Sequence, residues 1–422
     1  MKSRTVRLDL DLDLVALGAR SGLLWSRANA NDPVPTLAGV GHAVTIPVER
    51  PGGAAEAQAS LARLEGPNEV GGPGTGPVAF GAFPFDRTGG GELIVPEITL
   101  GRGGDGRRWL TIVDDGSLSA ADAIDRISGV AGPAGAGRAG GVGGGGAQPT
   151  SYELRSVLAP ELWRDEVVAG VRERIRSGQL DKAVVARELR LVTDHPVDAA
   201  LIVDQLAGTF PAAILFLVEG FVGASPELLV SRNGDVVRAH PLAGTAPRAS
   251  DPATDRRLAA ELLASSKDRW EHQITIDWLL DGLLPFCSYV DAEPEPSIVS
   301  LANVHHLGTL VEGRLSSPSA SALELVAALH PTPAVGGDPQ AVALSVIDEL
   351  EQAERGLDAG PVGWVDREGN GGFAVGIRSA QISGCEARLF AGVGVVGESD
   401  PESELAETRS KFRAMLGALI RP

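Results

Sequence analysis

One run of twelve residues, LDKAVVARELRL at 180–191, constrains the fold of this chain more than any other feature. The run is mostly apolar and includes β-branched valines, a pattern typical of a largely buried strand. Lys182 lies near its start, where the strand is expected to enter a pocket. Burial generally lowers the pKa of a lysine amine, so a lysine in such a pocket can act as a base near neutral pH. The alternative is a lysine whose stem covers the strand end while its amine reaches solvent.

The composition bounds the class of protein. With 422 residues, 43% of them hydrophobic, the chain can bury a large core in one large domain or two ordinary ones. The formal net charge of -18 argues against a nucleic-acid or anionic-membrane partner, so an anionic substrate must meet local cations. Cys287 and Cys385 are the only cysteines, which fits no disulfide framework or cysteine-based zinc site and indicates a reducing cytoplasm.

The first residues, MKSRTVRLDLDLDLV, alternate charged and apolar side chains as an edge strand does. They lack the apolar core of a signal peptide, and no run in the chain is long enough to span a membrane. We therefore expect a cytoplasmic protein with no membrane partner.

A Gly/Ala/Pro-rich segment divides the chain. Residues 129–149 have the composition of a disordered linker or surface loop. Residues 1–128 carry short strand patterns between Gly and Pro clusters and are expected to be a β-rich scaffold. Residues 150–422 alternate long helices with hairpins and are expected to carry the catalytic function.

The order of elements in the second part favours an α+β fold. Helices are expected at 159–179, 200–206, 251–284 with a break near Ser265, 319–328, 339–352 and 401–420. Strands are expected at 213–222, 227–231, 236–239, 362–366, 373–382 and 387–396, and Asn233-Gly234 is a strong hairpin signal. Because this order is not a regular βαβ alternation, we predict antiparallel strands flanked by helices.

Two helices each carry a pair of carboxylates on one face. Asp268 and Glu271 are three residues apart, and Glu404, Glu407 and Lys411 share a face of the last helix by the same spacing. If the two faces converge, four carboxylates crowd together, which is costly unless a cation neutralises them. An all-oxygen ligand set favours magnesium. The alternative is two solvated helix faces.

Other residues can be interpreted in two ways. His306, in NVHHLGTL, is either a pocket residue or a core histidine that satisfies a backbone carbonyl, and Arg378, after FAVGI, is a pocket or a rim arginine. Gly392 and Gly394 lie in an apolar strand, where glycine is costly unless a ligand or backbone comes close. Gly244 and Thr245 can offer an amide and a hydroxyl to a ligand or simply form a tight turn.

These segments together carry a family resemblance. The motifs are LDKAVVAR, GASPELL, HPLAGTAPR, KDRWEHQ, VHHLGT, LHPTPAVGG, PVGWVDREGNG, FAVGIR, LFAGVGVV and ESELAETRSK. In this order they resemble the chorismate-utilising enzymes, and most closely the isochorismate synthases, over about residues 151–420. GAFPFD and LIVPE, nearer the N-terminus, resemble the first part of the same family.

The resemblance implies one α+β domain of two stacked, mainly antiparallel β-sheets surrounded by helices, with the N-terminal part packed into the same fold. It implies a Mg2+ ion on Glu271 and Glu407, with Asp268 and Glu404 holding its waters, that grips the ring carboxylate of chorismate. It also implies a substrate-binding set in which Arg378 and Lys411 hold the enolpyruvyl carboxylate; its other members are Gly244, Thr245, His306, Gly392 and Gly394.

The resemblance further gives Lys182 and Glu227 their roles. Lys182 matches the general base that deprotonates a water attacking the ring carbon beside the carboxylate-bearing one. Glu227, in SPELL, matches the general acid that protonates the departing hydroxyl; from its residue type alone it would be a strand-end carboxylate. The implied activity is isochorismate synthase, an isomerase, that feeds menaquinone or a catechol or salicylate siderophore.

Two positions bear on the subtype. Synthases that form a covalent lysine adduct carry that lysine in the segment matching PLAGT, where this chain has Ala243. The lysine at position 182 favours water over ammonia, so no glutamine amidotransferase subunit is expected, and we expect a monomer. Salicylate synthase, which also eliminates pyruvate, is the alternative. A catalytically silent binding or scaffold subunit is a third possibility, but it predicts lost catalytic residues.

One position departs from the family pattern. Asp358, in ERGLDAGPVGW, stands where the family usually has a bulky aromatic residue before the Gly-Pro turn. It either loosens packing near the site or lies on the surface.

Overall fold

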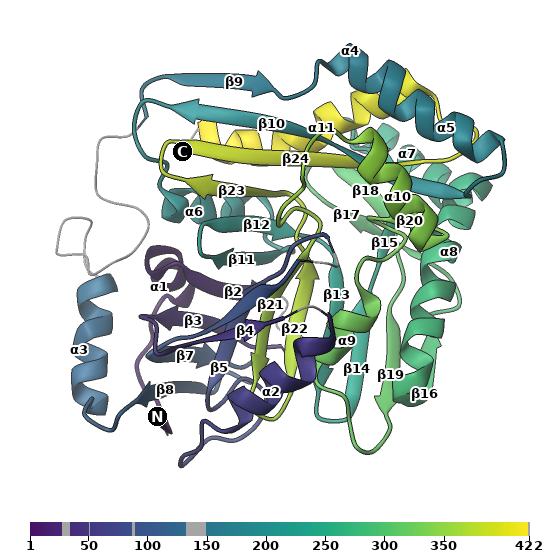
Figure 1. The fold of residues 1–422 in the computed structure, drawn as a ribbon. Coiled ribbons are helices and arrows are strands. Elements are labelled where there is room, and N and C mark those ends of the chain that lie inside the picture. Colours follow the sequence, from purple (N-terminus) through teal and green to yellow (C-terminus); the bar gives the residue numbers. More distant parts are fainter. Residues whose placement is uncertain (28–33, 50, 87–88, 132–148, 421–422) are drawn as a thin grey trace.

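The molecule is built from two large antiparallel sheets and one small sheet, with helices around them (Figure 1). The computed structural model describes residues 1–27, 34–49, 51–86, 89–131 and 149–420. The first part of the chain supplies β1 (Lys2–Arg7), α1 (Leu14–Ser21), β2 (Leu23–Arg27), β3 (Thr36–Val40), β4 (Val44–Val48), α2 (Ala54–Ala62), β5 (Val78–Ala82), β6 (Gly91–Val95), β7 (Ile98–Arg102), β8 (Arg108–Asp114) and α3 (Ala120–Ala131).

The second part of the chain ends with a long helix. Its first elements are β9 (Tyr152–Ser156), α4 (Pro160–Leu162), a π-helical turn (Trp163–Val168), α5 (Ala169–Arg176), β10 (Lys182–Thr193), α6 (Ala199–Thr209), β11 (Ile214–Val218), β12 (Phe221–Ser225), β13 (Leu228–Asn233), β14 (Val236–His240), β15 (Leu242–Pro247), α7 (Pro252–Ala264) and α8 (Ser266–Leu283). The remaining elements are β16 (Cys287–Ala292), β17 (Ser297–Ser300), β18 (Val304–Gly308), β19 (Val311–Leu315), α9 (Ala322–Leu329), β20 (Gly337–Asp338), α10 (Gln340–Leu350), β21 (Pro361–Asp366), β22 (Gly371–Val375), β23 (Ser379–Ser383), β24 (Glu386–Val395) and α11 (Pro401–Ile420).

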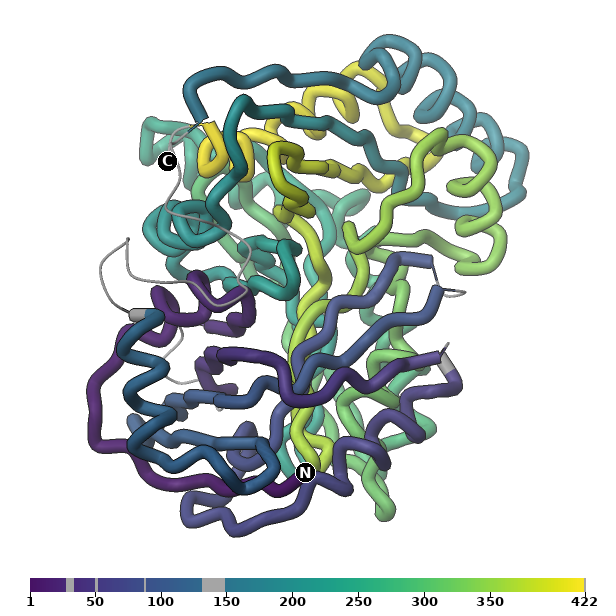
Figure 2. Tube along the Cα trace, turned by 60° about the vertical axis from the view of Figure 1, so that its left-hand side comes forward, coloured from purple at the N-terminus to yellow at the C-terminus, as the bar shows by residue number. Residues whose placement is uncertain are grey.

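Strands from both parts of the chain share the two large sheets. The 12-stranded sheet runs β1-β8-β7-β3-β2-β11-β12-β23-β24-β10-β20, with β9 also paired to β10, and the 9-stranded sheet runs β16-β19-β14-β13-β22-β21-β5-β6-β4. Figure 2 shows the later strands running beside the N-terminal ones, as the pairing of β21 with β5 requires. The N-terminal strand β1 lies at the edge of its sheet, as its sequence predicts.

A buried core lies between the two large sheets. Trp25 and Phe216 of the 12-stranded sheet pack in one cluster with Phe80 and Trp364 of the 9-stranded sheet. On the other face of the 12-stranded sheet, apolar residues of α6 and α11 pack against β10, β11 and β24. The predicted α+β fold of stacked, mainly antiparallel sheets is therefore confirmed, and the small sheet β15-β18-β17 adds to it.

Two predicted strands are divided in the structure. The strand predicted at 213–222 is a hairpin of β11 and β12 that turns at Glu219 and Gly220, both with positive φ. The strand predicted at 373–382 is broken between β22 and β23, where Arg378 has a φ of 54°. Since β22 belongs to the 9-stranded sheet and β23 to the 12-stranded sheet, this break carries the chain from one sheet to the other.

The helix predictions are close to the structure. The predicted break near Ser265 separates α7 from α8, and the Ser265 side chain caps α8 by accepting from the Asp268 backbone N–H. Helix α3 runs to Ala131 and so includes the start of the predicted 129–149 linker, whereas residues 132–148 lie outside the described residues. Among the described helices, none has the length and apolar character needed to cross a bilayer.

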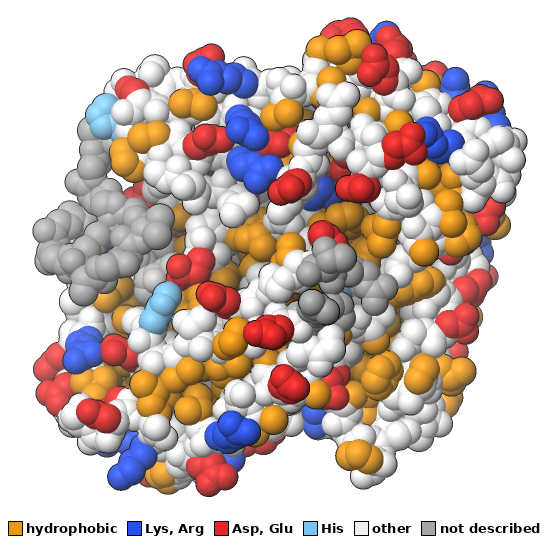
Figure 3. All heavy atoms as spheres, in the orientation of Figure 1, with side chains coloured by type: hydrophobic (Ala, Val, Ile, Leu, Met, Phe, Trp, Pro, Cys, Tyr) orange, Lys and Arg blue, Asp and Glu red, His pale blue; other side chains and the backbone are white. Residues whose placement is uncertain are grey.

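Acidic side chains are spread over the face shown in Figure 3, with lysines and arginines between them. They form no single large patch on this face. This distribution fits the net charge of -18.

Candidate active site

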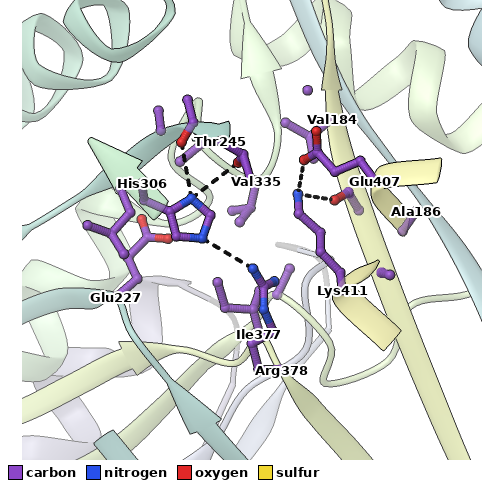
Figure 4. Close-up of a pocket in the computed structure, with 18 of the residues that line it drawn as sticks. Val184, Ala186, Glu227, Thr245, His306, Val335, Ile377, Arg378, Glu407 and Lys411 are labelled. Carbon is purple, nitrogen blue, oxygen red and sulfur yellow. Dashed lines mark hydrogen bonds and ion pairs between the residues drawn. The ribbon is translucent and has the colours of Figure 1, made fainter. Parts of the chain in front are cut away.

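A cavity lies where strands β10, β15, β18 and β24 meet helices α8 and α11 (Figure 4). It encloses about 1030 Å³ of space, part of it open to solvent. Every predicted site residue except Lys182 lines it: Glu227, Gly244, Thr245, Asp268, Glu271, His306, Arg378, Gly392, Gly394, Glu404, Glu407 and Lys411. Residues far apart in sequence therefore meet at one place.

Strand register builds one wall of the cavity. In the β10–β24 pair, Val184 lies opposite Gly394 and Ala186 lies opposite Gly392, and all four residues line the cavity. A Cβ atom at Gly394 would lie 2.7 Å from Glu271 Oε1 and 3.0 Å from Lys182 Cε. Glycine at this position therefore leaves room for charged side chains that reach over the strand.

Lys182 lies directly behind this wall. Its side chain is 1% exposed, and Nζ forms an ion pair with Glu271 Oε1 at 2.8 Å. Glu271 itself lines the cavity. Burial acts to raise the pKa of Glu271, but the positive charges of Lys182, Lys267 and Lys411 outweigh it and lower that pKa. The predicted base, Lys182, thus lies beside the site, but its amine is paired with Glu271, one of the predicted metal ligands.

The four predicted metal-site carboxylates converge on the cavity from α8 and α11. Burial raises the pKa of Asp268, and the nearby Glu271 and Glu407 raise it further. Burial, with the charge of Glu407, raises the pKa of Glu404 to about 7. Their mutual repulsion shows that these carboxylates lie close enough to interact. In the alternative interpretation, two helix faces exposed separately to solvent, the carboxylates of one helix would not affect the pKa values of the other.

The donor set suits a hard cation with retained water. Among the described residues, no three His, Cys, Asp or Glu side chains form a ready-made metal cluster. Magnesium is commonly bound through one or two carboxylates and keeps several waters, so it does not need such a cluster. Glu271 and Glu407 as direct ligands, with Asp268 and Glu404 behind waters, are compatible with that preference.

Lys411 and Glu407 form a pair on one turn of α11. Lys411 Nζ lies 2.6 Å from Glu407 Oε1 and donates to the carbonyl oxygen of Gly392 at 2.8 Å. These contacts hold the ammonium group at the cavity wall (Figure 4). The spacing of four residues along the helix predicts this pair.

His306 combines both interpretations open from its sequence. Its Nδ1 donates to the Gly244 carbonyl oxygen at 3.1 Å and lies 3.2 Å from Thr245 Oγ1, while Nε2 lies 3.2 Å from Arg378 Nη2 (Figure 4). Burial, together with the charges of Arg378 and Lys411, lowers the pKa of His306 to about 3. The imidazole is therefore neutral and can accept from the arginine. Gly244 has a φ of 73° beside a bulge in β15, a conformation that favours glycine.

Glu227 lies in the loop between β12 and β13 and is 2% exposed. Burial raises the pKa of this carboxyl to about 8, although a backbone hydrogen bond from Leu242 and the charge of Lys182 oppose the rise. The loop is fixed by Ser225, whose hydroxyl donates to the Val375 carbonyl oxygen at 2.6 Å. The group therefore carries a proton at neutral pH and faces the cavity.

Three charged residues of the wall were not predicted as site residues. Lys267 lines the cavity beside Asp268, and its position next to that aspartate was an available signal. Arg355 and Asp358 line it from the segment before β21. Asp358 is only 7% exposed, so the surface alternative for this residue is wrong.

Comparison with known proteins finds similar chains among the isochorismate synthases. The chain is 42% identical over 280 residues to "Isochorismate synthase DhbC" of Bacillus subtilis, which covers 64% of this chain and 70% of that protein. It is 40% identical over 268 residues to "Isochorismate synthase MenF" of Bacillus subtilis, covering 62% of this chain and 57% of that protein. The solved structure of MenF, the menaquinone-specific isochorismate synthase of Escherichia coli, superposes with a TM-score of 0.79 at 25% identity and covers 99% of this chain and 94% of that one.

The family assignment follows from a family model that matches nearly the whole chain. The family model described as "Chorismate binding enzyme" matches residues 18–420, which include every strand of the two large sheets except β1 and both carboxylate-bearing helices. The resemblance found in the sequence motifs is thereby confirmed. This chain belongs to the family of chorismate binding enzymes.

Proposed function

We propose that the chain is an isochorismate synthase, which converts chorismate to isochorismate by adding water to the ring and releasing the ring hydroxyl. The observation that carries this proposal is Glu227, a carboxyl group whose pKa is raised to about 8 by burial on the cavity wall. A carboxyl protonated at neutral pH can give its proton to a departing hydroxyl. The relatives named above carry the name of this activity, which supports it.

The cavity walls supply cations for the enolpyruvyl carboxylate of chorismate and a lining for its ring. Arg378 and Lys411 would hold the enolpyruvyl carboxylate, because both are cations on the wall. Gly244, Thr245, Gly392 and Gly394, with His306, would line the ring and its side chain. A dianion can thus bind within a strongly acidic protein, since local cations offset the overall charge.

The carboxylates of α8 and α11 would hold Mg2+. Glu271 and Glu407 are the proposed direct ligands, with Asp268 and Glu404 placed to hold its waters. When bound there, the ion supplies positive charge at the ring carboxylate, where negative charge develops during the reaction.

Lys182 and Glu227 would carry the proton transfers. Lys182 takes a proton from a water whose oxygen bonds to the ring carbon beside the carboxylate-bearing carbon. The ring double bonds shift, and the bond to the departing hydroxyl breaks as Glu227 gives that oxygen its proton. One water enters and one leaves, so the conversion is an isomerisation. Since Lys182 Nζ is paired with Glu271 at 2.8 Å, the amine must leave this partner to serve as base.

The residue at position 243 supports water as the nucleophile, because it has no amine. Ala243 lines the cavity and offers no amine for a covalent adduct with the ring. Water as nucleophile requires no ammonia channel and no glutamine amidotransferase subunit. We further propose that the protein acts as a cytoplasmic monomer whose product enters menaquinone or siderophore synthesis.

The direct test is incubation of the purified chain with chorismate, with and without magnesium chloride, followed by separation of the products. With magnesium we expect isochorismate and unchanged chorismate and no other product. Without magnesium we expect unchanged chorismate alone. Salicylate with pyruvate would instead assign the alternative activity, salicylate synthase. Unchanged chorismate under all conditions would overturn the proposed function.

A further inference from the structure

Asp358 is a buried carboxyl group in the cavity wall that the reaction above does not use. It is 7% exposed and lies in the segment between α10 and β21. Ala359 N–H donates to the Gly376 carbonyl oxygen at 2.9 Å, and Gly376 N–H donates to the Gly360 carbonyl oxygen at 2.7 Å. These reciprocal bonds fix the Asp358 turn beside the strand break that carries Arg378.

The turn is held in an unusual backbone conformation on both sides. Ala359 has a φ of 60° and Arg378 a φ of 54°, and non-glycine residues rarely adopt such values. Conformations of this kind persist only where surrounding contacts impose them, and they cluster at ligand sites. The placement of Asp358 next to Arg378 is therefore a fixed feature of the cavity.

The charged groups around Asp358 are Arg355, Glu351 and Arg378, and the Ser379 hydroxyl also contacts it. Glu227, Glu407 and Lys411 line the same cavity. Burial raises the pKa of Asp358 to about 7, with Arg355 and Arg378 opposing the rise and Glu351 adding to it. Among the described residues, no cation lies within ion-pair distance of the Asp358 carboxyl.

The hydrogen bonds of Arg355 are made to groups other than Asp358. Its guanidinium pairs with Glu351 Oε1 at 2.6 Å and donates to the carbonyl oxygens of Val184 at 2.5 Å and Val335 at 3.0 Å. It also stacks on the Phe85 ring, 4.1 Å from the centroid. Arg355 therefore acts on the Asp358 carboxyl through its charge but forms no ion pair with it among the described residues.

Arg378, in contrast, has unused donor capacity. Nη2 contacts His306, whereas the buried Nε has no hydrogen-bond partner among the described residues. A buried unpartnered donor on a cavity wall is suited to an anionic ligand group. Because Asp358 lines the same cavity and its charge acts on Arg378, a carboxylate bound at Arg378 would come near Asp358.

We propose that Asp358 determines specificity for the substrate carboxylate bound at Arg378: as a neutral carboxylic acid it donates a hydrogen bond to that carboxylate, and as an anion it repels it. This inference rests on the proposed function, because the carboxylate is that of the enolpyruvyl group. A neutral acid beside a carboxylate gives a strong, short hydrogen bond, whereas two carboxylates in one buried site repel each other. Affinity for chorismate should therefore fall as the pH rises above about 7.

The test measures chorismate binding without turnover. Glu227→Gln removes the proposed acid, so the dissociation constant of chorismate can be determined by calorimetry at fixed magnesium chloride between pH 6 and pH 9. The same titration is made with Glu227→Gln combined with Asp358→Asn. The readout is the dissociation constant of the variant that keeps Asp358 divided by that of the variant with Asp358→Asn. This ratio cancels the titration of all other groups in the cavity.

We expect the ratio to be constant below pH 7 and to rise toward tenfold per pH unit above it, since asparagine donates but does not ionise. Asp358→Leu in the same background should bind weakly at every pH, because it has neither donor nor charge. Asp366→Asn is the matched control: this buried carboxyl also has a pKa raised by burial to about 7, but it lies at the end of β21 and outside the cavity. It should leave the pH profile unchanged, and thermal unfolding verifies the fold of each variant.

A ratio that is independent of pH would overturn the role of Asp358. The proposed function is tested separately by isochorismate formation in the unmodified protein at pH 7. An active enzyme with a flat ratio refutes only the inference about Asp358. An inactive enzyme with a rising ratio refutes only the proposed reaction.

Discussion

Replacing Gly394 by alanine should disable the site without unfolding the protein. The new Cβ would lie 2.7 Å from Glu271 Oε1 and 3.0 Å from Lys182 Cε. Ordinary van der Waals contact begins at 3.4 Å, so the carboxylate oxygen must retreat by about 0.7 Å. No positive φ is required at position 394, so alanine is compatible with the strand backbone.

The displaced groups are the ones on which the proposed chemistry depends. Glu271 is the proposed metal ligand and Lys182 the proposed base, and the two are joined at 2.8 Å. A misplacement of roughly 1 Å in a catalytic constellation can cost on the order of 100-fold in rate, so we expect a loss of kcat approaching about 100-fold. KM for chorismate should change less, because Arg378 and Lys411, which are proposed to hold the enolpyruvyl carboxylate, are not among the nearest neighbours of the new Cβ.

The assay is steady-state isochorismate formation, with thermal unfolding as a check on the fold. Gly392→Ala is a graded comparison, since the atom nearest to its Cβ would be Val184 Cγ1 at 3.3 Å, and it should cost less activity than Gly394→Ala. Gly208→Ala is the matched control, because a Cβ there meets nothing within 4 Å. A folded Gly394→Ala protein with unreduced kcat would refute the assignment of Lys182 and Glu271.

Three further predictions concern acid catalysis, metal and stability. Glu227 must be protonated to act as acid, so kcat should fall as pH rises through about 8, the value to which burial raises its pKa, and Glu227→Gln should be slow at every pH; a rate that increases between pH 8 and pH 9 would argue against this role. Glu407→Gln should raise the magnesium concentration that half-saturates activity and weaken Mg2+ binding in calorimetry, whereas Glu402→Gln, exposed on the same helix, should change neither; equal behaviour of the two variants would remove Glu407 from the metal site. Glu351→Gln leaves the buried Arg355 charge without its 2.6 Å partner and should cost about 3–5 kcal/mol in urea unfolding, whereas Glu261→Gln, which breaks an exposed pair with Arg257, should leave the midpoint unchanged.

Local patterns predicted the parts of the fold that local forces decide. The strand at 180–191 and the helix break at Ser265 follow from residue type and capping chemistry over a few positions, and the structure has β10 and the α7–α8 junction there. The turn at Glu219 and the break at Arg378 did not follow, because both are non-glycine residues held at positive φ by the surrounding structure. An apolar pattern that continues across such a turn looks like one strand.

The site was predictable in membership more than in arrangement. Spacing along one helix predicts that Glu407 and Lys411 share a face, and the family motifs name the residues that line the cavity. The pairing of Lys182 with Glu271 joins a strand to a helix far along the chain, and no sequence period encodes such a contact. Asp358 stood out as a departure from the family, but only its burial next to Arg378 makes it a candidate for binding.

The central claim is that water, activated by Lys182, becomes the new hydroxyl group of the product. The most direct measurement is the reaction of chorismate in water enriched in oxygen-18, followed by mass spectrometry of isochorismate. We predict that the product hydroxyl carries the label from solvent and that Lys182→Ala, with its fold intact, forms no labelled product. Unlabelled isochorismate would show that the hydroxyl moves within the substrate and would contradict the account.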